Sequence, residues 1–350
     1  MTEKTEPVKL SQFSKGGGCG CKIAPSVLQE ILQTNSSSAC NQLLVGNESS
    51  DDAAVYRLNE ETALISTTDF FLPIVDDAFD FGKIAAANAI SDVYAMGGKP
   101  LMAIAILGWP IDKLPAAEAQ RVLDGGRAIC EDAGIPLAGG HTIDAADPIF
   151  GLAVTGTVAI KNLKRNNSAK EGDVLFLTKA LGIGVLSTAM KRGLLKADDY
   201  HTLINLTTTL NKIGETLGAV EGVHALTDVT GFGLLGHLAE MTEGSGLSAE
   251  VFYNAIPKIA VLGDYLRQRT IPDATFRNWN SYSNKVQFGK GVNVMEAFNL
   301  LPDPQTNGGL LIAASKKAAG EVQQILEKEG LITQPIGEMT KRKEKLIYVS

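Results

Sequence analysis

The sequence predicts a two-domain α/β protein of the α+β type, preceded by a mobile glycine-rich leader. A chain of 350 residues is long enough to form two domains, each with its own core. Segments with helical spacing of apolar residues are interspersed with short apolar strands along the whole chain. The polar segment 161–173 interrupts this pattern, and we therefore expect the domain boundary there.

The predicted organisation has four parts. Residues 1–48 comprise the leader and an N-terminal helix, and residues 49–160 form the first α/β domain. A linker at 161–173 leads into the second α/β domain at 174–350. The elements expected before the linker are helices at Ala24–Gln33, Phe81–Met96 and Ala116–Ala133, with strands at Ala53–Tyr56, Ala63–Thr67, Met102–Leu107 and Phe150–Ile160.

Local signals support these elements. Pro25 suits the first turn of the predicted helix Ala24–Gln33. The pair Gly97-Gly98 is a stop signal at the end of the predicted helix Phe81–Met96. The strand Ala63–Thr67 is expected to continue into a turn that carries Asp69. The elements expected after the linker are a strand at Val174–Thr178, a helical stretch from Gly182 to Arg192, helices at Thr202–Leu217, Leu234–Thr242 and Lys316–Lys328, and strands around a basic turn between Leu331 and Val349.

Composition and charge exclude several classes of protein. The net charge is −7 and no basic block stands out, which disfavours a nucleic-acid partner. No apolar run approaches the ~20 residues of a membrane helix, and the N-terminus lacks the apolar core of a signal peptide. The four cysteines do not form the pattern of a secreted disulfide framework. We therefore expect a cytoplasmic protein that binds neither nucleic acid nor membranes.

The leader segment Gly16–Lys22 places two thiols and an amine in a stretch with little backbone preference. It is not a Walker loop, because Cys21 and Ile23 stand where that motif needs Gly and Ser or Thr. A nearby ammonium lowers the pKa of a thiol, so one interpretation is a lid that delivers Cys19 and Lys22. The alternatives are a loose tail with incidental cysteines and a soft-metal site formed by Cys19 and Cys21.

Several carboxylates follow the leader. Asp51 and Asp52 precede an apolar strand, and their adjacent carboxylates either pair with cations or lie in a solvated turn. Asn88 and Asp92 are four residues apart, share one face of an apolar helix, and form either a satisfied buried pair or part of a metal site. Together with Asp69 these residues favour a magnesium cluster, because Mg²⁺ prefers oxygen ligands and bridges to substrate phosphates.

Two further segments carry polar residues that suit phosphate or metal. The pair Gly139-Gly140 lets a backbone approach an anion, and His141 and Thr142 can donate to phosphate oxygens. An ordinary turn is the alternative. Asp228 either caps the helix that follows it or brings a carboxylate to the magnesium cluster from the second domain.

Two further glycine-containing motifs suggest no additional binding site. The turn 303–309 precedes an apolar segment, and we expect it to stabilise the fold. Gly182-Ile183-Gly184 lacks the third glycine of a dinucleotide fingerprint, so a Rossmann-type site is not expected.

Seven segments carry a resemblance that spans nearly the whole chain: GGGCGCKI at 16–23, NESSDDAAVY at 47–56, STTDFFLPIVD at 66–76, NAISDVYAMGGKP at 88–100, AGGHTID at 138–144, LTDVTGFGLLGHL at 226–238 and DPQTNGGLL at 303–311. In this order they closely resemble the selenophosphate synthetase family (selenide, water dikinases). The Cys-Gly-Cys-Lys leader distinguishes that family within the wider aminoimidazole-ribonucleotide synthetase superfamily. Asn307 is a departure, because Ser is expected there in many relatives.

The resemblance implies the two-domain fold of that superfamily, with ATP and metal bound by the first domain. It implies a homodimer with nucleotide sites near the subunit interface and more than one Mg²⁺ per site. It also implies a kinase-type transferase that converts ATP, selenide and water into selenophosphate, AMP and phosphate. This product supplies selenium for selenocysteine and selenouridine synthesis.

The resemblance also assigns residues. Cys19 and Lys22 are the implied catalytic residues, and Asp52, Asp92 and Asp228 are the implied metal ligands. The implied ATP contacts are Lys22, Ser49, Ser50, Asp51, Asp69, Asp92 and, donated by the partner subunit, Gly140, His141 and Thr142.

Two other functions remain as alternatives. Another ATP-using enzyme of the superfamily would share the carboxylates but would not need Cys19 and Lys22. A non-enzymatic carrier of selenium or of a soft metal would use Cys19 and Cys21, and it would leave the carboxylates without a role.

Overall fold

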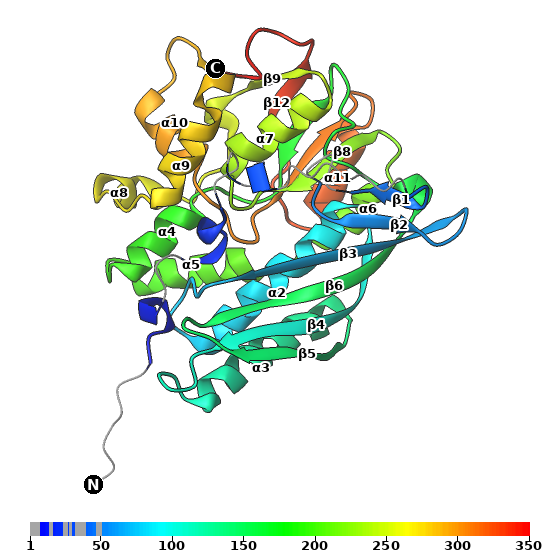
Figure 1. The fold of residues 1–350 in the computed structure, drawn as a ribbon. Helices are drawn as coiled ribbons and strands as arrows, with labels where there is room; N and C mark the ends of the chain where they lie inside the picture. The colour runs from blue at the N-terminus through cyan, green and yellow to red at the C-terminus, as the bar shows by residue number, and fades with distance from the viewer. Residues whose placement is uncertain (1–7, 14–16, 24–26, 28–29, 32–39, 47–50) are drawn as a thin grey trace.

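The computed structural model describes residues 8–13, 17–23, 27, 30–31, 40–46 and 51–350, with the backbone alone at Cys19 and Cys21. Within these residues the chain forms two sheets, each built from a separate part of the sequence (Figure 1). The first has six strands in the order β1-β2-β3-β6-β4-β5, and the second has seven in the order β10-β13-β9-β12-β7-β11-β8. The fold is therefore a mixed α/β fold with two sheets.

The first sheet is antiparallel except for the pair β4 and β5, which is parallel. β3 and β6 pair without interruption from Thr62 opposite Ala159 to Phe71 opposite Phe150. The strands are β1 (Leu43–Val45), β2 (Ala54–Arg57), β3 (Thr62–Phe71), β4 (Lys99–Trp109), β5 (Leu137–Asp144) and β6 (Ile149–Ala159).

The second sheet follows the segment 161–173. β11 lies between β7 and the edge strand β8 and is antiparallel to both, and all five residues of β11 are buried. The strands are β7 (Val174–Leu177), β8 (Val223–Asp228), β9 (Ser248–Val251), β10 (Val286–Phe288), β11 (Leu310–Ala314), β12 (Pro335–Thr340) and β13 (Ile347–Val349).

Helices pack around both sheets. The α-helices are α2 (Ala78–Ala95), α3 (Ala116–Ala133), α4 (Ile183–Lys191), α5 (Ala197–Thr208), α6 (Ile213–Gly218), α7 (Gly233–Gly244), α8 (Leu262–Arg267), α9 (Asp273–Tyr282), α10 (Val294–Leu300) and α11 (Ala319–Lys328). Short 3-10 helices are η1 (Leu10–Phe13), η2 (Gly18–Cys21), η4 (Ile160–Asn162), η5 (Tyr253–Ala255) and η6 (Ser283–Lys285). None of the described helices combines the length and the apolar character that crossing a membrane requires.

Helix α2 connects the two halves of the molecule. It begins at Asp77, whose carboxylate accepts a hydrogen bond from the Asp80 amide at 2.9 Å and so caps the helix. One side of α2 packs on β3, β6 and α3, and the other contacts α5, α6 and β8 (Figure 1). The helix is therefore buried nearly all round, and its polar residues lie between the two sheets.

Three predicted elements are wrong in detail. Asp69 lies inside β3 and not in a turn, because β3 keeps its pairing with β6 through Phe71. The predicted helix Thr202–Leu217 is two helices, α5 and α6, and the carbonyl of Thr209 at the break accepts from Lys179. The segment 137–142 is not a turn after a strand but part of edge strand β5.

Other predictions agree closely with the structure. The helix predicted at Ala116–Ala133 matches α3, and the one at Phe81–Met96 differs from α2 by a few residues. The helix predicted at Ala24–Gln33 lies largely outside the described residues, and the mobility of the leader stays a prediction.

Close packing of α2 on α3 depends on two glycines. A Cβ at Gly82 would lie 1.9 Å from the carbonyl oxygen of Val122, and one at Gly125 would lie 2.0 Å from that of Phe79. We predict that Gly82→Ala lowers the free energy of unfolding by about 1–3 kcal/mol or more, because the two backbones must separate. Urea denaturation measures this change.

Gly320, in α11, is the matched control, because a Cβ there meets no atom within 4 Å. Gly320→Ala should leave stability unchanged or raise it slightly. Equal effects of the two substitutions would show that the helix contact is not close-packed.

Candidate functional site

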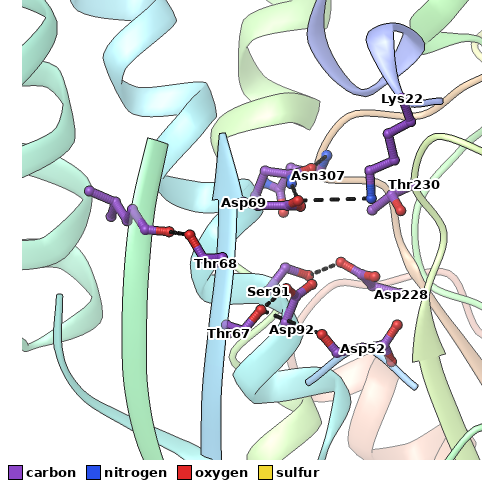
Figure 2. Close-up of polar contacts among 12 residues, drawn as sticks. Lys22, Asp52, Thr67, Thr68, Asp69, Ser91, Asp92, Asp228, Thr230 and Asn307 are labelled. Carbon is purple, nitrogen blue, oxygen red and sulfur yellow. Dashed lines mark hydrogen bonds and ion pairs between the residues drawn. The ribbon is translucent and has the colours of Figure 1, made fainter. Parts of the chain in front are cut away.

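Polar side chains from four parts of the chain converge where α2 meets both sheets (Figure 2). Asp52 precedes β2, and Asp69 lies on β3. Asp92 is on α2, and Asp228 is the last residue of β8. Segments far apart in sequence thus bring four carboxylates to one place, as the predicted cluster requires.

The local geometry follows from the periods of strand and helix. Thr67 and Asp69 are two apart on β3 and face α2, because side chains alternate along a strand. Asn88, Ser91 and Asp92 have the spacing i, i+3 and i+4, so they share one face of α2. The polar face of the helix therefore meets the polar face of the strand.

Hydroxyl groups orient the three carboxylates that were expected to bind metal. Thr67 Oγ1 donates to Asp92 Oδ2 at 2.5 Å, and Ser91 Oγ donates to Asp228 Oδ2 at 2.5 Å. Thr227 Oγ1 donates to Asp52 Oδ1 at 2.9 Å. Each carboxylate is thus held through one oxygen.

Burial and mutual repulsion raise the pKa values of these carboxyls. Burial raises the pKa of Asp52 well above its usual range, and the charges of Asp228 and Asp92 raise it further. The pKa of Asp92 is raised by burial and by Asp69 and Asp228, and burial also raises the pKa of Asp228. Lys22 opposes the shift at Asp92 and Asp228. The site therefore favours added positive charge.

The residues fit a divalent cation that also takes ligands from a substrate. Asp52 Oδ2 is buried and accepts no hydrogen bond, so it retains its capacity as a ligand. Across the described residues, no three Asp, Glu, His or Cys side chains gather closely enough to hold a metal ion by themselves. Mg²⁺ commonly uses one or two carboxylates, waters and substrate phosphates, which suits carboxylates that are near one another but not gathered into a complete ligand set.

A chain of contacts joins the leader to the second domain. Lys22 Nζ lies 3.9 Å from Asp69 Oδ1, and Asn88 Nδ2 donates to Asp69 Oδ2 at 2.5 Å (Figure 2). The backbone amide of Asn307 donates to Asn88 Oδ1 at 2.6 Å. Asn88 therefore fixes the carboxylate that faces the leader amine.

Asn307 is itself held firmly. Its φ of 48° is in the left-handed region, which Asn tolerates better than most residues. Its side chain donates to the carbonyls of Thr207 and Thr209, and its own carbonyl accepts from Lys179 Nζ at 2.8 Å. Burial lowers the pKa of Lys179 to about 7. Asn307, where many relatives were expected to have Ser, thus holds Asn88 in place and through it Asp69.

The rest of the turn 303–309 has the structural role expected of it. Asp303 Oδ2 accepts from the amide of Gly184, and Gln305 Oε1 accepts from the amide of Ile183. These contacts satisfy the N-terminal amides of α4. The motif Gly182-Ile183-Gly184 therefore forms the start of α4 and packs against this turn.

Several predicted site residues lie elsewhere in the protomer. Gly140, His141 and Thr142 are exposed on β5, which β6 and β4 separate from β3. Asp51 Oδ1 accepts from the backbone amide of Asn166 at 2.7 Å and so contacts the segment 161–173. Cys19 lies in η2, described by its backbone. Ser49 and Ser50 lie outside the described residues.

Two interpretations of the carboxylates are wrong. Asp228 does not cap a helix, since α7 begins at Gly233 after Phe232. Asn88 and Asp92 do not form a pair, because Asn88 bonds Asp69 while Asp92 bonds Thr67.

The sequence analysis missed the hydroxyls and Lys179. Thr67, Ser91 and Thr227 are each one or two residues from a site carboxylate in the sequence. This spacing could have identified them. Asn211 Nδ2, which donates to Ser91 Oγ at 2.8 Å, and Lys179 had no such signal.

Comparisons with known proteins place the chain among the AIR synthase related proteins. The family model of the AIR synthase related protein, N-terminal domain, matches residues 50–158, and that of the C-terminal domain matches residues 170–349. A selenide, water dikinase of Pseudomonas putida is 52% identical over 346 residues, covering 99% of both chains. One of Yersinia pseudotuberculosis is 53% identical over 334 residues, covering 95% of both.

The chain belongs to the selenide, water dikinase family. Solved structures of other activities share its fold. A thiamine-monophosphate kinase of Stenotrophomonas maltophilia has a TM-score of 0.65 at 21% identity, covering 94% of this chain and 96% of that one. Hydrogenase maturation protein HypE in complex with ATP has a TM-score of 0.63 at 18% identity, covering 83% and 80%. The family thus shares its fold with proteins that carry other names, and the fold alone does not decide the function.

The raised carboxyl pKa values make a prediction about stability. A carboxyl whose folded pKa exceeds its unfolded value lowers stability as pH rises between the two values. Asp92→Asn should therefore raise the free energy of unfolding at pH 7.5 by about 1 kcal/mol or more when divalent cations are chelated. The gain should shrink as the pH falls through the ordinary Asp pKa of about 3.9 toward pH 3, where Asp92 is mostly protonated in both states.

Asp124, in an exposed ion pair with Arg127, provides the control. Asp124→Asn should change stability by less than ~0.5 kcal/mol at either pH. A loss of stability in Asp92→Asn at pH 7.5 without metal would contradict the raised pKa.

Proposed function

We propose that this chain is a selenophosphate synthetase, which converts ATP, selenide and water into selenophosphate, AMP and phosphate. The observation that carries the proposal is the placement of the leader: Lys22 Nζ lies 3.9 Å from Asp69 at the edge of the buried carboxylates. Cys19, three residues earlier, belongs to η2, which contacts β3, and this supports a role for Cys19 at the same site. We further propose that the enzyme acts in the cytoplasm and that residues 49–160 form the ATP- and metal-binding domain, with 174–350 as the second domain.

Positive charge at the carboxylates makes ATP binding feasible. A triphosphate would add several negative charges beside Asp52, Asp92 and Asp228, which already repel one another. These three residues would hold more than one Mg²⁺, and the ions would neutralise the phosphates. Ser49, Ser50 and Asp51 are proposed to contact the nucleotide from the segment before β2.

Lys22 contributes a further charge from the leader. Its side chain is 38% exposed, so it can reach a phosphate while Asp69 holds the ammonium in place. Phosphoryl transfer depends mainly on positioning and on neutralising charge, which an ammonium on a closing leader supplies. Closure would also keep water away from the first transfer.

Cys19 supplies the soft nucleophile that suits selenium. Selenide is mainly HSe⁻ at neutral pH, and a thiolate shares its soft character. An ammonium three residues away favours the thiolate of Cys19. We propose that Cys19 binds or positions selenide for attack on the terminal phosphate, while Cys21 has no catalytic role.

Phosphorus NMR of the reaction products tests the activity. With ATP, Mg²⁺ and selenide, the spectrum should show selenophosphate and equal amounts of AMP and phosphate. Without selenide the selenophosphate signal should be absent. ADP as the final product, or no selenide dependence, would instead favour another ATP-using enzyme of the superfamily.

The role of Cys19 leads to a specific prediction. Cys19→Ser should abolish selenophosphate formation, with a loss of at least about 100-fold, because a hydroxyl does not bind selenium. Binding of a fluorescent ATP analogue should remain within about 2-fold of the wild-type value. Cys21→Ser is the matched control and should retain activity. A Cys19→Ser enzyme with normal turnover would show that the thiol is not involved.

A homodimer would complete the site. The face of the first sheet that α2 and α3 leave uncovered exposes Tyr56, Phe70, Met102, Ile104 and Ile143. Apolar patches of this kind mark interaction surfaces. We propose that a second copy covers this face and that Gly140, His141 and Thr142 contact the nucleotide bound by the partner. Within one protomer β6 and β4 separate these residues from β3, so they are too far from their own nucleotide site.

Mixing two inactive variants tests this arrangement. His141→Ala and Asp92→Asn should each be inactive alone, but their heterodimers contain one site with both native residues. Unfolding and refolding an equal mixture should therefore recover about one quarter of wild-type activity for a two-fold symmetric dimer. No recovery would place His141 and Asp92 in the same protomer's site. Joint refolding of the wild type controls for losses.

A further inference from the structure

A cavity lies on the other side of the leader from the carboxylates. Its volume is about 530 Å³, within the range of about 300–1,000 Å³ that small-molecule sites occupy. It lies between η2, the residues that follow β3, and the helices α4 and α9. None of the carboxylates Asp52, Asp69, Asp92 and Asp228 lines it, so it is distinct from the proposed nucleotide site.

The cavity is cationic in an acidic protein. Among the residues that the structure describes, Lys191 and Arg192 at the end of α4 and Arg277 on α9 line it, against one acid, Asp273. The whole chain carries a net charge of −7. All three cations are exposed, so their charge reaches the solvent at the mouth. A small anion is therefore attracted here and repelled by most of the remaining surface.

The leader forms the wall between this cavity and the carboxylates. Gly17 and Gly20 line the cavity, and Arg277 Nη2 donates to the Gly20 carbonyl at 2.8 Å. The Gly18 amide donates to the Leu72 carbonyl at 3.0 Å. Lys22 faces the opposite direction, toward Asp69. The backbone of Cys19 therefore lies between a cationic cavity and an anionic site.

Two glycines of the leader allow it to pack this closely against its neighbours. A Cβ at Gly18 would lie 2.4 Å from Thr306 Oγ1, and one at Gly17 would lie 3.0 Å from the Pro73 carbonyl. The glycines thus let the leader seat closely against the end of β3 and the turn 303–309. The residues that follow β3 and the turn 303–309 both line the cavity.

We propose that this cavity is the entrance through which the anionic acceptor, hydrogen selenide, reaches Cys19. The inference rests on the proposed function and adds a separate route and subsite for the acceptor. An anion that approached through the carboxylates would meet like charge, whereas Lys191, Arg192 and Arg277 lower that barrier on the other side. A guanidinium has five N–H donors, so the carbonyl bonds of Arg192 and Arg277 leave donors for a ligand.

The cavity is much larger than hydrogen selenide, which suits a hydrated entrance. Steering by surface charge raises association rates by about 10–1,000-fold and weakens as salt screens the field. The Debye length is ≈ 8–10 Å near physiological ionic strength, so charges at the mouth act over the depth of such a cavity. The entrance thus favours an anion without binding it tightly.

A double substitution tests the proposal with ATP as an internal reference. Lys191→Met with Arg192→Met removes two cations and leaves Arg277, which bonds the leader. At low salt we expect kcat/KM for selenide to fall at least about 10-fold, while KM for Mg-ATP stays within about 2-fold of the wild-type value. At 0.5 M salt the selenide values of variant and wild type should converge.

The matched control is Lys316→Met with Lys317→Met. These lysines follow β11 at the end opposite the turn 303–309, and their loss changes the net charge equally. The control should keep the wild-type kcat/KM for selenide at every salt concentration. An equal fall in both double variants would overturn the proposal, because total charge alone would then explain the effect.

The outcomes separate the two levels of inference. A wild-type enzyme that forms no selenophosphate would reject the proposed function. An active wild type whose Lys191→Met, Arg192→Met variant keeps the same selenide kcat/KM and salt dependence would reject the entrance alone. A matching rise in KM for Mg-ATP would also reject it, since the cavity would then serve the nucleotide.

Discussion

Burial of three mutually repelling carboxylates is the constraint on which the rest of this structure depends. Asp52, Asp92 and Asp228 come from opposite sides of a domain junction, and burial raises the pKa of each. Without cations this arrangement costs free energy. The hydroxyls of Thr67, Ser91 and Thr227 orient the carboxylates but add no positive charge. Stability is thus lowered at a place where bound charge would restore it.

The surrounding fold positions this cluster precisely. Helix α2 is buried between both sheets, so its polar residues face β3 and β8 at once. Lys179 and Asn307 fix the turn that supports Asn88, and Asn88 fixes the carboxylate opposite Lys22. The leader then lies between the buried carboxylates and a cationic cavity. Under the proposed function, this arrangement would separate the two anionic substrates until both reach the leader.

Much of the fold and the identity of the site could be predicted from sequence. Apolar periodicity predicted α3 correctly, and Asp52, Asp69, Asp92 and Asp228 do converge. Periodicity failed where tertiary contacts decide: Thr209 breaks a helix by bonding Lys179, and pairing with β6 extends β3 past Asp69. Short buried strands such as β8 and β11 show no alternation of apolar and polar residues, so periodicity could not identify them as strands. Lys179 had no local signal, because its partners are backbone carbonyls far away in sequence.

The most direct test of the carboxylate account is proton release on binding the preformed Mg²⁺ complex of a non-hydrolysable ATP analogue. Calorimetry in buffers of different ionisation enthalpy measures the protons released per complex bound. Because burial and mutual repulsion favour the protonated forms of these carboxyls, binding of the cations should release protons, with less release as pH increases. Asp92→Asn should release fewer. Binding without proton release at every pH from 5 to 8 would contradict the account.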